Sequence, residues 1–391
     1  MKNLNKRAFS VKPSVTIALN NKAHELISQG KEIINFSIGE PYFPAPREAK
    51  KAVQRALKEN RNRYTPAAGL PELRRLVARK FSTENGIECD SGNVIISNGA
   101  KHSIFNALAA IIGQGDEVII PRPAWFTYAE QLKLLEGVPV YAESGKNFEV
   151  KAEAIEEKIS GHTKAIIINS PCNPTGGVTR KSELRKIADI ALQNDLYVVS
   201  DEVYEHFVYD DAKHCSIASL DSEIASRTIT INSASKAYAM TGYRIGYLAC
   251  RKDIAETIES FQSQMTSNAG NLSQYACIGA LGSGNAFPKK MAGEFDKGRK
   301  LMLKMFSGIP GMDVVRPQGA FYMLPNFENF YRDGIRSSAD FSAFLLEKAS
   351  LMTVPGSEFG AEGCIRFSFA LPKAEIRTGM ERLAVALALG K

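Results

Sequence analysis

The sequence predicts an α/β protein whose main part is a mostly parallel, three-layer sheet domain, accompanied by a smaller α+β domain. Between residues 94 and 200, short β-branched apolar runs alternate with segments of helical pattern. Parallel strands need a crossover connection, usually a helix, so this alternation is typical of β-α-β units. The runs are apolar throughout, as in strands that helices cover on both faces.

The length of 391 residues favours two domains over one simple core. We expect a large domain at 46–284 and a smaller one at 285–391, to which an N-terminal arm, residues 1–45, also contributes. The boundary is placed at the Gly-Ser-Gly-Asn turn of 282–285, after which a long charged helix is predicted.

The predicted elements follow in chain order. A helix runs to about residue 29, where Gly30 ends it and Pro13 and Ser14 suit its start, and a strand at 33–38 and a helix at 47–60 come next. Strands are predicted at 94–97, 118–120, 138–141, 165–169 and 196–200, with helices beginning at 102, 125, 152 and 181. Further strands are expected at 228–231, 247–250 and 364–370 and as a pair near 314 and 321–322, with helices ending at 265 and spanning 289–305 and 338–348.

Composition argues against several classes of protein. Hydrophobic residues make up 44% and charged residues 23%, which is ordinary for a globular protein. The net charge of +7 is spread along the chain without a long basic run, so we expect no nucleic-acid partner. Neither a signal peptide nor a bilayer-length apolar run is present, so we expect a cytoplasmic protein without a membrane partner. The six cysteines and five histidines lack metal-ligand spacing, and no metal is expected.

One stretch at a predicted strand end, Ser233–Gly246, combines small residues, hydroxyls, one lysine and one arginine. Lysine can form an imine with a carbonyl, best where burial or a neighbouring cation lowers its pKa, and the arginine fork suits a phosphate. The stretch resembles the pyridoxal-phosphate attachment motif of class I and II aminotransferases, of fold type I. The resemblance implies that Lys236 forms the imine with pyridoxal 5'-phosphate while Ser233 and Arg244 hold the phosphate. The alternative is a solvated loop lysine with a surface ion pair.

Two further strand-end motifs resemble the same family in the same order. The segment 169–176, Asn-Ser-Pro-Cys-Asn-Pro-Thr-Gly, resembles the family's Asn-Pro-x-Asn-Pro-Thr-Gly, with Cys172 in place of the commoner asparagine, which implies that Asn173 donates to the phenolic oxygen of the cofactor. The segment 201–204 matches Asp-Glu-x-Tyr, so Asp201 would lie at the pyridine nitrogen and Tyr204 at the phenolic oxygen. Taken alone, the first segment could be a proline-rich turn and Asp201 a helix cap.

Three other segments carry cofactor contacts by resemblance. Gly99 and Ala100 precede or begin a helix whose backbone N–H groups could bind a phosphate. Trp125 stands where the family stacks an aromatic ring on the cofactor, although ordinary core packing is the alternative. Tyr64 matches a tyrosine that reaches the phosphate in the partner subunit, which implies a homodimer with shared sites; a surface tyrosine is the alternative.

Substrate contacts are implied in the same way. Arg366 matches the family arginine that grips the substrate α-carboxylate, and a structural ion pair is the alternative. Gly39 would place its N–H near that carboxylate, or serve a tight turn. Lys101 and Thr16 match a prokaryotic aspartate aminotransferase subgroup, in which they contact the distal carboxylate; a solvated lysine is the alternative. Trp125 and Asn173 are expected to border the substrate as well.

The resemblance implies a pyridoxal-phosphate-dependent aminotransferase that moves the amino group of an L-amino acid, aspartate first, to 2-oxoglutarate by a ping-pong mechanism. Its partners would be amino acids and 2-oxo acids. Alternatives on the same fold are an aminotransferase for aromatic amino acids or prephenate, and a pyridoxal-phosphate lyase. A non-catalytic regulator would need an added DNA-binding segment, which the short N-terminus does not supply. No Gly-x-Gly-x-x-Gly follows a predicted strand, which argues against a dehydrogenase.

Overall fold

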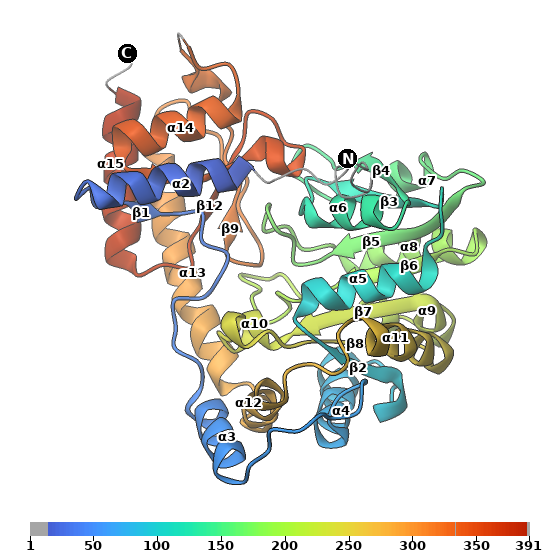
Figure 1. The fold of residues 1–391 in the computed structure, drawn as a ribbon. Helices are drawn as coiled ribbons and strands as arrows, with labels where there is room; N and C mark the ends of the chain where they lie inside the picture. The colour runs from blue at the N-terminus through green and yellow to red at the C-terminus, as the bar shows by residue number, and fades with distance from the viewer. Residues whose placement is uncertain (1–14, 333, 389–391) are drawn as a thin grey trace, which may run out of the picture.

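A seven-stranded sheet forms the centre of the molecule in the computed structural model, which describes residues 15–332 and 334–388 (Figure 1). The strand order is β2-β8-β7-β6-β5-β3-β4, and only β8 runs antiparallel to its neighbours. The strands span β2 Val94–Ser97, β3 Glu117–Arg122, β4 Val138–Glu143, β5 Thr163–Asn169, β6 Tyr197–Asp201, β7 Thr228–Ser233 and β8 Gly246–Ala249. The predicted fold class is confirmed, with strand positions close to those expected.

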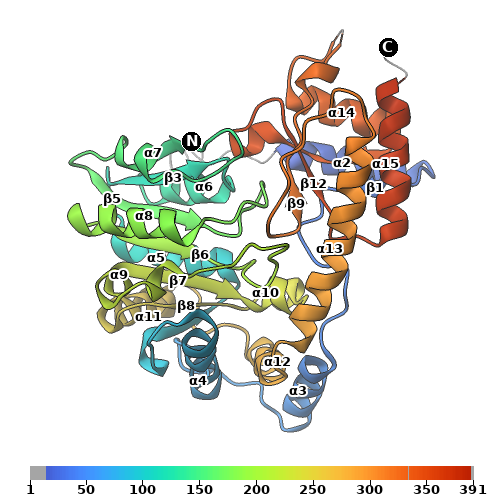
Figure 2. The same ribbon diagram turned by 180° about the vertical axis from the view of Figure 1, so that it is seen from behind.

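Helices cover both faces of this sheet, as the uniformly apolar strands require. Ile167 of β5 packs in the core beneath one set of helices, while its neighbours Ile166 and Ile168 pack in the core on the opposite face. Figures 1 and 2 show α5 and α11 on one face and α8 and α9 on the other. The helices of this part span α3 Arg47–Lys58, α4 Pro71–Lys80, α5 Ala100–Ile111, α6 Thr127–Leu134, α7 Ala152–Glu156, α8 Lys181–Gln193, α9 Ser222–Arg227, α10 Ala234–Ala237, α11 Lys252–Met265 and α12 Asn271–Gly282.

The two ends of the chain build a second body, which we call the terminal lobe. It consists of α2 Val15–Ser28, β1 Ile34–Asn35, α13 Ala286–Ser307, β9 Tyr322–Met323, α14 Ser338–Ala349, β10 Leu351–Met352, β11 Val354–Pro355, β12 Ile365–Ser368 and α15 Lys373–Ala388. β1 pairs in parallel with β10, and β12 lies between β11 and β9. A core rich in phenylalanine, including Phe36, Phe295 and Phe367, joins these segments. In Figure 2, α13 runs from α12 up to α14.

Some expectations differ from the structure. The strand expected near Val314 is wrong, because only an isolated bridge from Asp313 to Asn326 forms there. Helices α4, α12 and α15 were not predicted. In α12 the sequence gives little amphipathic signal, because this helix packs against both α3 and α4 and is buried on more than one side. The helix start expected at Pro13 and Ser14 lies outside the described residues. Within the described part, no helix is both long and apolar enough to cross a membrane.

A buried charge cluster stands behind the end of β6. The ammonium group of Lys80, at the end of α4, pairs with Glu205 and donates to Asn85 Oδ1 at 2.7 Å, and Lys80 and Glu205 are both almost fully buried. Glu202 accepts hydrogen bonds from Ser200, Ser216 and Asn85 and lies 3.1 Å from His214 Nε2. Burial raises the pKa of Glu205, but Lys80, His206 and His214 outweigh it and hold that pKa at about 2.

The same cluster contains the two groups of described side chains that have metal-ligand spacing. One is formed by Glu84, Glu205 and His206, and the other by Glu202, Glu205 and His214. Lys80 already supplies a cation beside Glu205. We therefore interpret the cluster as an ionic clamp that joins α4 to the end of β6.

Replacing Lys80 by methionine is expected to destabilise the protein strongly, because Glu205 would remain buried without its cation. Removing one partner of a buried ion pair typically costs about 3–5 kcal/mol. Thermal unfolding followed by circular dichroism should show a clearly lower Tm than for the unmutated protein.

Lys297→Met is the matched control, since Lys297 pairs with Glu294 at the surface, where ion pairs contribute little. Its Tm should stay near that of the unmutated protein. Equal Tm values for the two variants would contradict the interpretation of the cluster as a clamp.

Candidate active site

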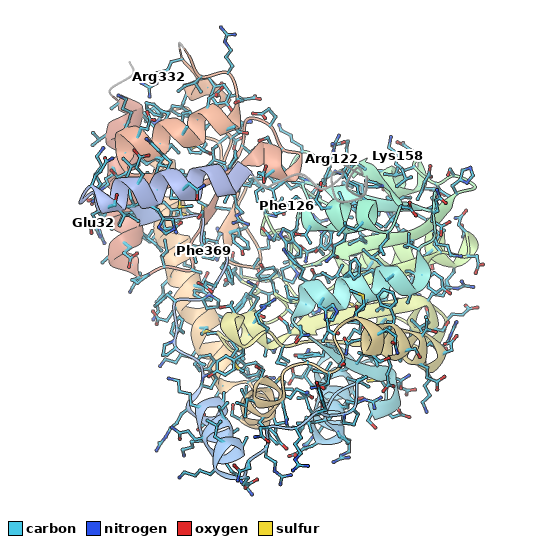
Figure 3. The ribbon with its side chains drawn as sticks, viewed as in Figure 1. Glu32, Arg122, Phe126, Lys158, Arg332 and Phe369 are labelled. Carbon is cyan, nitrogen blue, oxygen red and sulfur yellow. The ribbon has the colours of Figure 1, made fainter. Side chains whose placement is uncertain are left out.

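A cavity of about 500 Å³ opens at the carboxyl ends of the parallel strands, between the sheet and the terminal lobe. Figure 3 shows Phe126, which lines it, on the side of the sheet that faces this lobe. Most of the residues singled out from the sequence line this one cavity: Gly39, Ala100, Lys101, Trp125, Asn173, Asp201, Tyr204, Ser233, Lys236, Arg244 and Arg366. Open α/β sheets bind ligands at this edge.

The register of three strands brings the polar groups together. In the parallel ladder, Asn169 at the end of β5 pairs with Asp201 at the end of β6, and Asp201 pairs with Ile231 of β7. The side chain of Asn169 donates to the carbonyl of Asp201 and accepts from the N–H of Asn173. The ends of β5 and β6 are therefore tied to each other and to the loop that follows β5.

Lys236 lies in the short helix α10, directly after β7, and its ammonium group donates to the carbonyl oxygen of Gly39. Burial, together with the positive charges of Arg366 and Arg244, lowers the pKa of Lys236 to about 8, whereas Glu40 opposes the shift. A much larger fraction of this amine is neutral near pH 7 than for an exposed lysine. A neutral amine is the form that attacks a carbonyl.

Asp201 is the buried carboxylate of the cavity. Burial raises its pKa to about 6, and hydrogen bonds from Tyr128 and from the N–H of Val203 oppose this rise. The Tyr128 hydroxyl donates to Asp201 Oδ2 at 2.7 Å. A carboxylate held in this way can remain ionised and pair with a protonated ring nitrogen.

One corner of the cavity suits a phosphate. Arg244 adopts a left-handed backbone conformation, with φ of 56°, and its guanidinium group lies against Gly99. Gly99 has φ of 85°, and a Cβ at this position would overlap the Arg244 guanidinium. Gly99 is the N-cap of α5, whose first N–H groups have no partners within the helix. Together with the Ser233 hydroxyl, these groups form an anion-binding set.

Arg366 lies on β12 and is buried, yet its charge is only partly satisfied. Its Nη1 donates to Asn173 Oδ1 at 2.8 Å and its Nη2 to the carbonyl of Ser37 at 2.9 Å. The guanidinium lies over the ring of Tyr322, while its Nε is buried without a partner in the described structure. Tyr322 in turn shares a hydrogen bond of 3.0 Å with Tyr204. A buried arginine with an unused donor suits a carboxylate ligand.

A second cation, Lys101, comes from the first turn of α5. Its ammonium group lies 4.8 Å from the centre of the Trp125 ring. Burial lowers the pKa of Lys101, and the charge of Arg244 lowers it further. In the described structure Lys101 lines the cavity but remains exposed, and its Nζ forms no ion pair with a carboxylate within 4 Å.

Two predicted residues are not among those that line the cavity. Gly99 borders it only through Arg244, and Tyr64 is 91% exposed on the outer surface. Thr16 belongs to α2, and its side chain lies outside the described structure.

The sequence did not single out several lining residues: Ser37, Glu40, Tyr128, Ser235, Thr241, Tyr322 and Phe359. Ser235 and Thr241 were inside the lysine motif and could have been found there. Tyr128 follows Trp125 by three positions, one helical turn, which is a weak signal. Tyr322 and Phe359 reach the cavity only through the packing of the terminal lobe, for which no local pattern exists.

Comparison with known proteins identifies the family. The family model described as aminotransferase class I and II matches residues 31–383. The chain belongs to the class I and II aminotransferases. It is 43% identical over 390 residues to a protein of Aquifex aeolicus named "Probable aspartate/prephenate aminotransferase", with 99% of each chain covered. It is 41% identical to an aspartate aminotransferase of a Bacillus species, covering 96% of this chain and 97% of the relative.

Solved structures agree with this assignment. The aspartate aminotransferase of Thermus thermophilus with maleate superposes with a TM-score of 0.93 at 37% identity, covering 99% of this chain and all of the other. The aspartate aminotransferase of Rhizobium meliloti gives a TM-score of 0.94 at 33% identity, with 99% of both chains covered. The aminotransferase is thus of fold type I, and its cofactor is pyridoxal 5'-phosphate.

The residues of the cavity fit this cofactor. An aldehyde, a phosphate and a ring nitrogen need an amine, an anion-binding set and a carboxylate. Lys236, the Arg244–Gly99 corner and Asp201 provide these three groups in one cavity. Gly99 leaves room for the Arg244 guanidinium, and a phosphate site at this corner would explain why a residue without a Cβ stands here.

Proposed function

We propose that this aminotransferase transfers the amino group of aspartate to 2-oxoglutarate in a ping-pong reaction. The observation that carries the proposal is the presence of two cations, Arg366 and Lys101, in the cavity that contains Lys236. A dicarboxylic substrate offers two anionic groups, and each would need a cation once water is excluded. The names of the relatives, aspartate aminotransferase in several bacteria, support the same substrate class.

The side chains divide the work as follows. Arg366 binds the substrate α-carboxylate through its guanidinium group, assisted by the N–H of Gly39, and Asn173 and Trp125 border the substrate. Ser233, Arg244, Gly99 and Ala100 hold the cofactor phosphate, with Tyr64 of a partner subunit. Asp201 binds the ring nitrogen, and Asn173 and Tyr204 bind the phenolic oxygen.

Pyridoxal phosphate, when bound, withdraws electrons from the substrate carbon that carries the amino group. Lys236 Nζ would accept the proton that leaves this carbon and would then release it again, so that the proton changes its position during the transfer of the amino group. Its lowered pKa lets the amine accept and release a proton near neutral pH.

A second candidate is an aminotransferase for prephenate or aromatic amino acids. The cavity is lined by the rings of Trp125, Phe126, Tyr322 and Phe359, which could pack on a bulky substrate. The Aquifex relative is named for both aspartate and prephenate. Tyr42 packs on Phe43 and Phe295 and is not among the residues that line the cavity. A lyase on this fold would share most of these groups, and analysis of the products distinguishes it.

We also propose a homodimer with shared sites, two domains divided at 45/46 and 284/285, and a cytoplasmic location. Tyr64 supports the dimer, because it is almost fully exposed on a loop whose backbone carbonyls accept hydrogen bonds from Asn271. A fixed loop that presents a large aromatic side chain to solvent suits a contact with a second chain.

Lys236→Ala should abolish covalent attachment of the cofactor, because no other amine would replace Nζ. The purified protein should lose the visible absorption of the enzyme-bound cofactor, and transamination of aspartate should fall to background. Lys297→Ala, a change at an exposed lysine, serves as the control and should keep both. Full turnover by Lys236→Ala would overturn the assignment.

Shared sites predict recovery of activity in mixed dimers. Inactive Lys236→Ala is unfolded and refolded together with a severely impaired Tyr64→Ala variant, and each heterodimer then contains one site with both native residues. Random assortment should restore about a quarter of the unmutated activity, since half of the dimers are mixed and one of their two sites is intact. Absence of recovery, with subunit exchange verified by mass spectrometry, would show that Tyr64 serves its own chain.

Lys101→Met tests the substrate. The change removes the charge but keeps most of the apolar stem, so packing on Trp125 should persist. Loss of one partner of a desolvated charge pair costs roughly 2–5 kcal/mol, so kcat/KM for aspartate should fall at least about tenfold. The value for alanine or phenylalanine as amino donor should change much less.

Lys101→Arg is the control with the charge retained, and it should lose less activity toward aspartate. Equal losses with charged and uncharged donors would indicate a cofactor or folding role for Lys101. Higher kcat/KM for an aromatic donor than for aspartate in the unmutated enzyme would favour the second candidate function.

A further inference from the structure

The start of α6 places two aromatic side chains around one edge of the active-site cavity. Trp125 precedes the helix, and Tyr128 is its second residue. Their rings meet edge to face, with centres 5.5 Å apart and planes at 89°. Tyr128 is 1% exposed, so its hydroxyl group needs a partner within the protein. That partner is the carboxylate of Asp201, at 2.7 Å.

Asp201 has few hydrogen-bond donors. Its Oδ2 accepts from Tyr128, and its Oδ1 accepts from the N–H of Val203 at 3.3 Å, which is a long bond. Among the side chains described, those of residues 21–332 and 334–388, Tyr128 is the only one that donates a hydrogen bond to this carboxylate. The titratable groups that face the pair from the surrounding elements are Glu202 and Tyr204 after β6, Lys236 of α10 and Cys172 of the loop after β5.

We propose that Tyr128 is a positioning residue that keeps Asp201 ionised, so that the proton shared with the cofactor stays on the ring nitrogen. The inference rests on the proposed role of Asp201. A pyridine nitrogen and a carboxylate in contact share one proton, and a strong donor to the carboxylate stabilises its anionic form. The proton is thereby left on the nitrogen, where it strengthens electron withdrawal by the ring.

The electrostatics of the site make this donor important. Burial and the negative charge of Glu202 raise the pKa of Asp201 to about 6 against the opposing hydrogen bonds, so a further rise would bring protonation of the carboxylate into the neutral range. The Tyr128 bond is the first of the groups that oppose this rise. Burial also raises the pKa of Tyr128 well above its usual value, so its hydroxyl remains a donor at every working pH.

The hydroxyl group has a predictable effect on the reaction. Without it, the carboxylate becomes the stronger base of the pair and the proton moves from the nitrogen to Asp201. A ring with a neutral nitrogen withdraws less charge, so proton removal from the substrate slows while substrate binding by Arg366 and Lys101 continues. The loss should therefore appear in kcat more than in KM.

The test is Tyr128→Phe in the holoenzyme, which removes one oxygen atom and keeps the ring against Trp125. Titration of the visible absorbance of the bound cofactor against pH should give an apparent pKa higher than in the unmutated enzyme. The value of kcat for aspartate should fall about tenfold, in keeping with the strength of hydrogen bonds to charged groups. KM should change by less than about threefold.

Two controls separate positioning from general structure. Tyr209→Phe removes another buried hydroxyl, which donates to the carbonyl of Ala320 at 2.5 Å, and it should lower Tm without changing the absorbance titration. In an Asp201→Asn background no carboxylate is available, so adding Tyr128→Phe should not shift the titration further. An equal shift with and without the Asp201 carboxylate would overturn the proposal.

A measurement on the cofactor-free protein distinguishes the possible failures. The infrared band of protonated Asp201, identified by its loss in Asp201→Asn, should appear at higher pH in Tyr128→Phe than in the unmutated protein. An unchanged band would refute the proposed role of Tyr128. If Asp201→Asn leaves the absorbance titration of the holoenzyme unchanged, the role of Asp201 itself fails, which is a separate result.

Discussion

The active site depends on the parallel register of β5, β6 and β7. These strands are apolar and covered on both faces, so their backbones are held by ladder hydrogen bonds and by packing at once. The register brings Asn169, Asp201 and Ser233 to the same edge of the sheet. Because the terminal lobe closes this edge, polar groups that emerge from the strands enter a cavity rather than bulk water. The arrangement of the strands beneath the terminal lobe therefore determines both where each polar group lies and how far it is shielded from water.

Burial brings the pKa values of the two principal charged groups of the cavity closer together. The pKa of Asp201 rises to about 6, and that of Lys236 falls to about 8. Both pKa values therefore lie much closer to neutral pH than those of exposed aspartate and lysine side chains. Pairs of groups shifted in this way are characteristic of proton-transfer sites. The charge cluster around Lys80 and Glu205 lies behind β6, and Glu202 connects the two regions, since it follows Asp201 directly and raises its pKa. The ionic clamp thus affects the pKa of Asp201 as well as the packing of α4.

The sequence predicted those features that depend on local patterns. The sheet followed from apolar runs between helical segments, and motifs in which spacing is fixed by one turn identified Lys236, Arg244, Asn173 and Asp201.

Features created by packing between distant segments were missed. Tyr128 meets Asp201 across 73 positions, and Tyr322 meets Tyr204 across 118, and neither pair leaves a local signature. Helix α12 escaped prediction for a related reason, since it packs against both α3 and α4 rather than presenting one apolar stripe. Tyr64 is a different case, because its proposed partner is another subunit.

Arg366 shows how the terminal lobe would take part in the proposed recognition of the substrate. Its guanidinium joins three segments: it belongs to β12, donates to the carbonyl of Ser37 beyond β1, and donates to Asn173 in the loop after β5. The carbonyl and amide oxygens it contacts are neutral acceptors, weaker than a carboxylate. A substrate carboxylate would therefore compete favourably for the same donors and use the Nε that is without a partner in the described structure. Since these donors also connect the lobe to the sheet, binding of the α-carboxylate and the relative placement of lobe and sheet depend on one side chain.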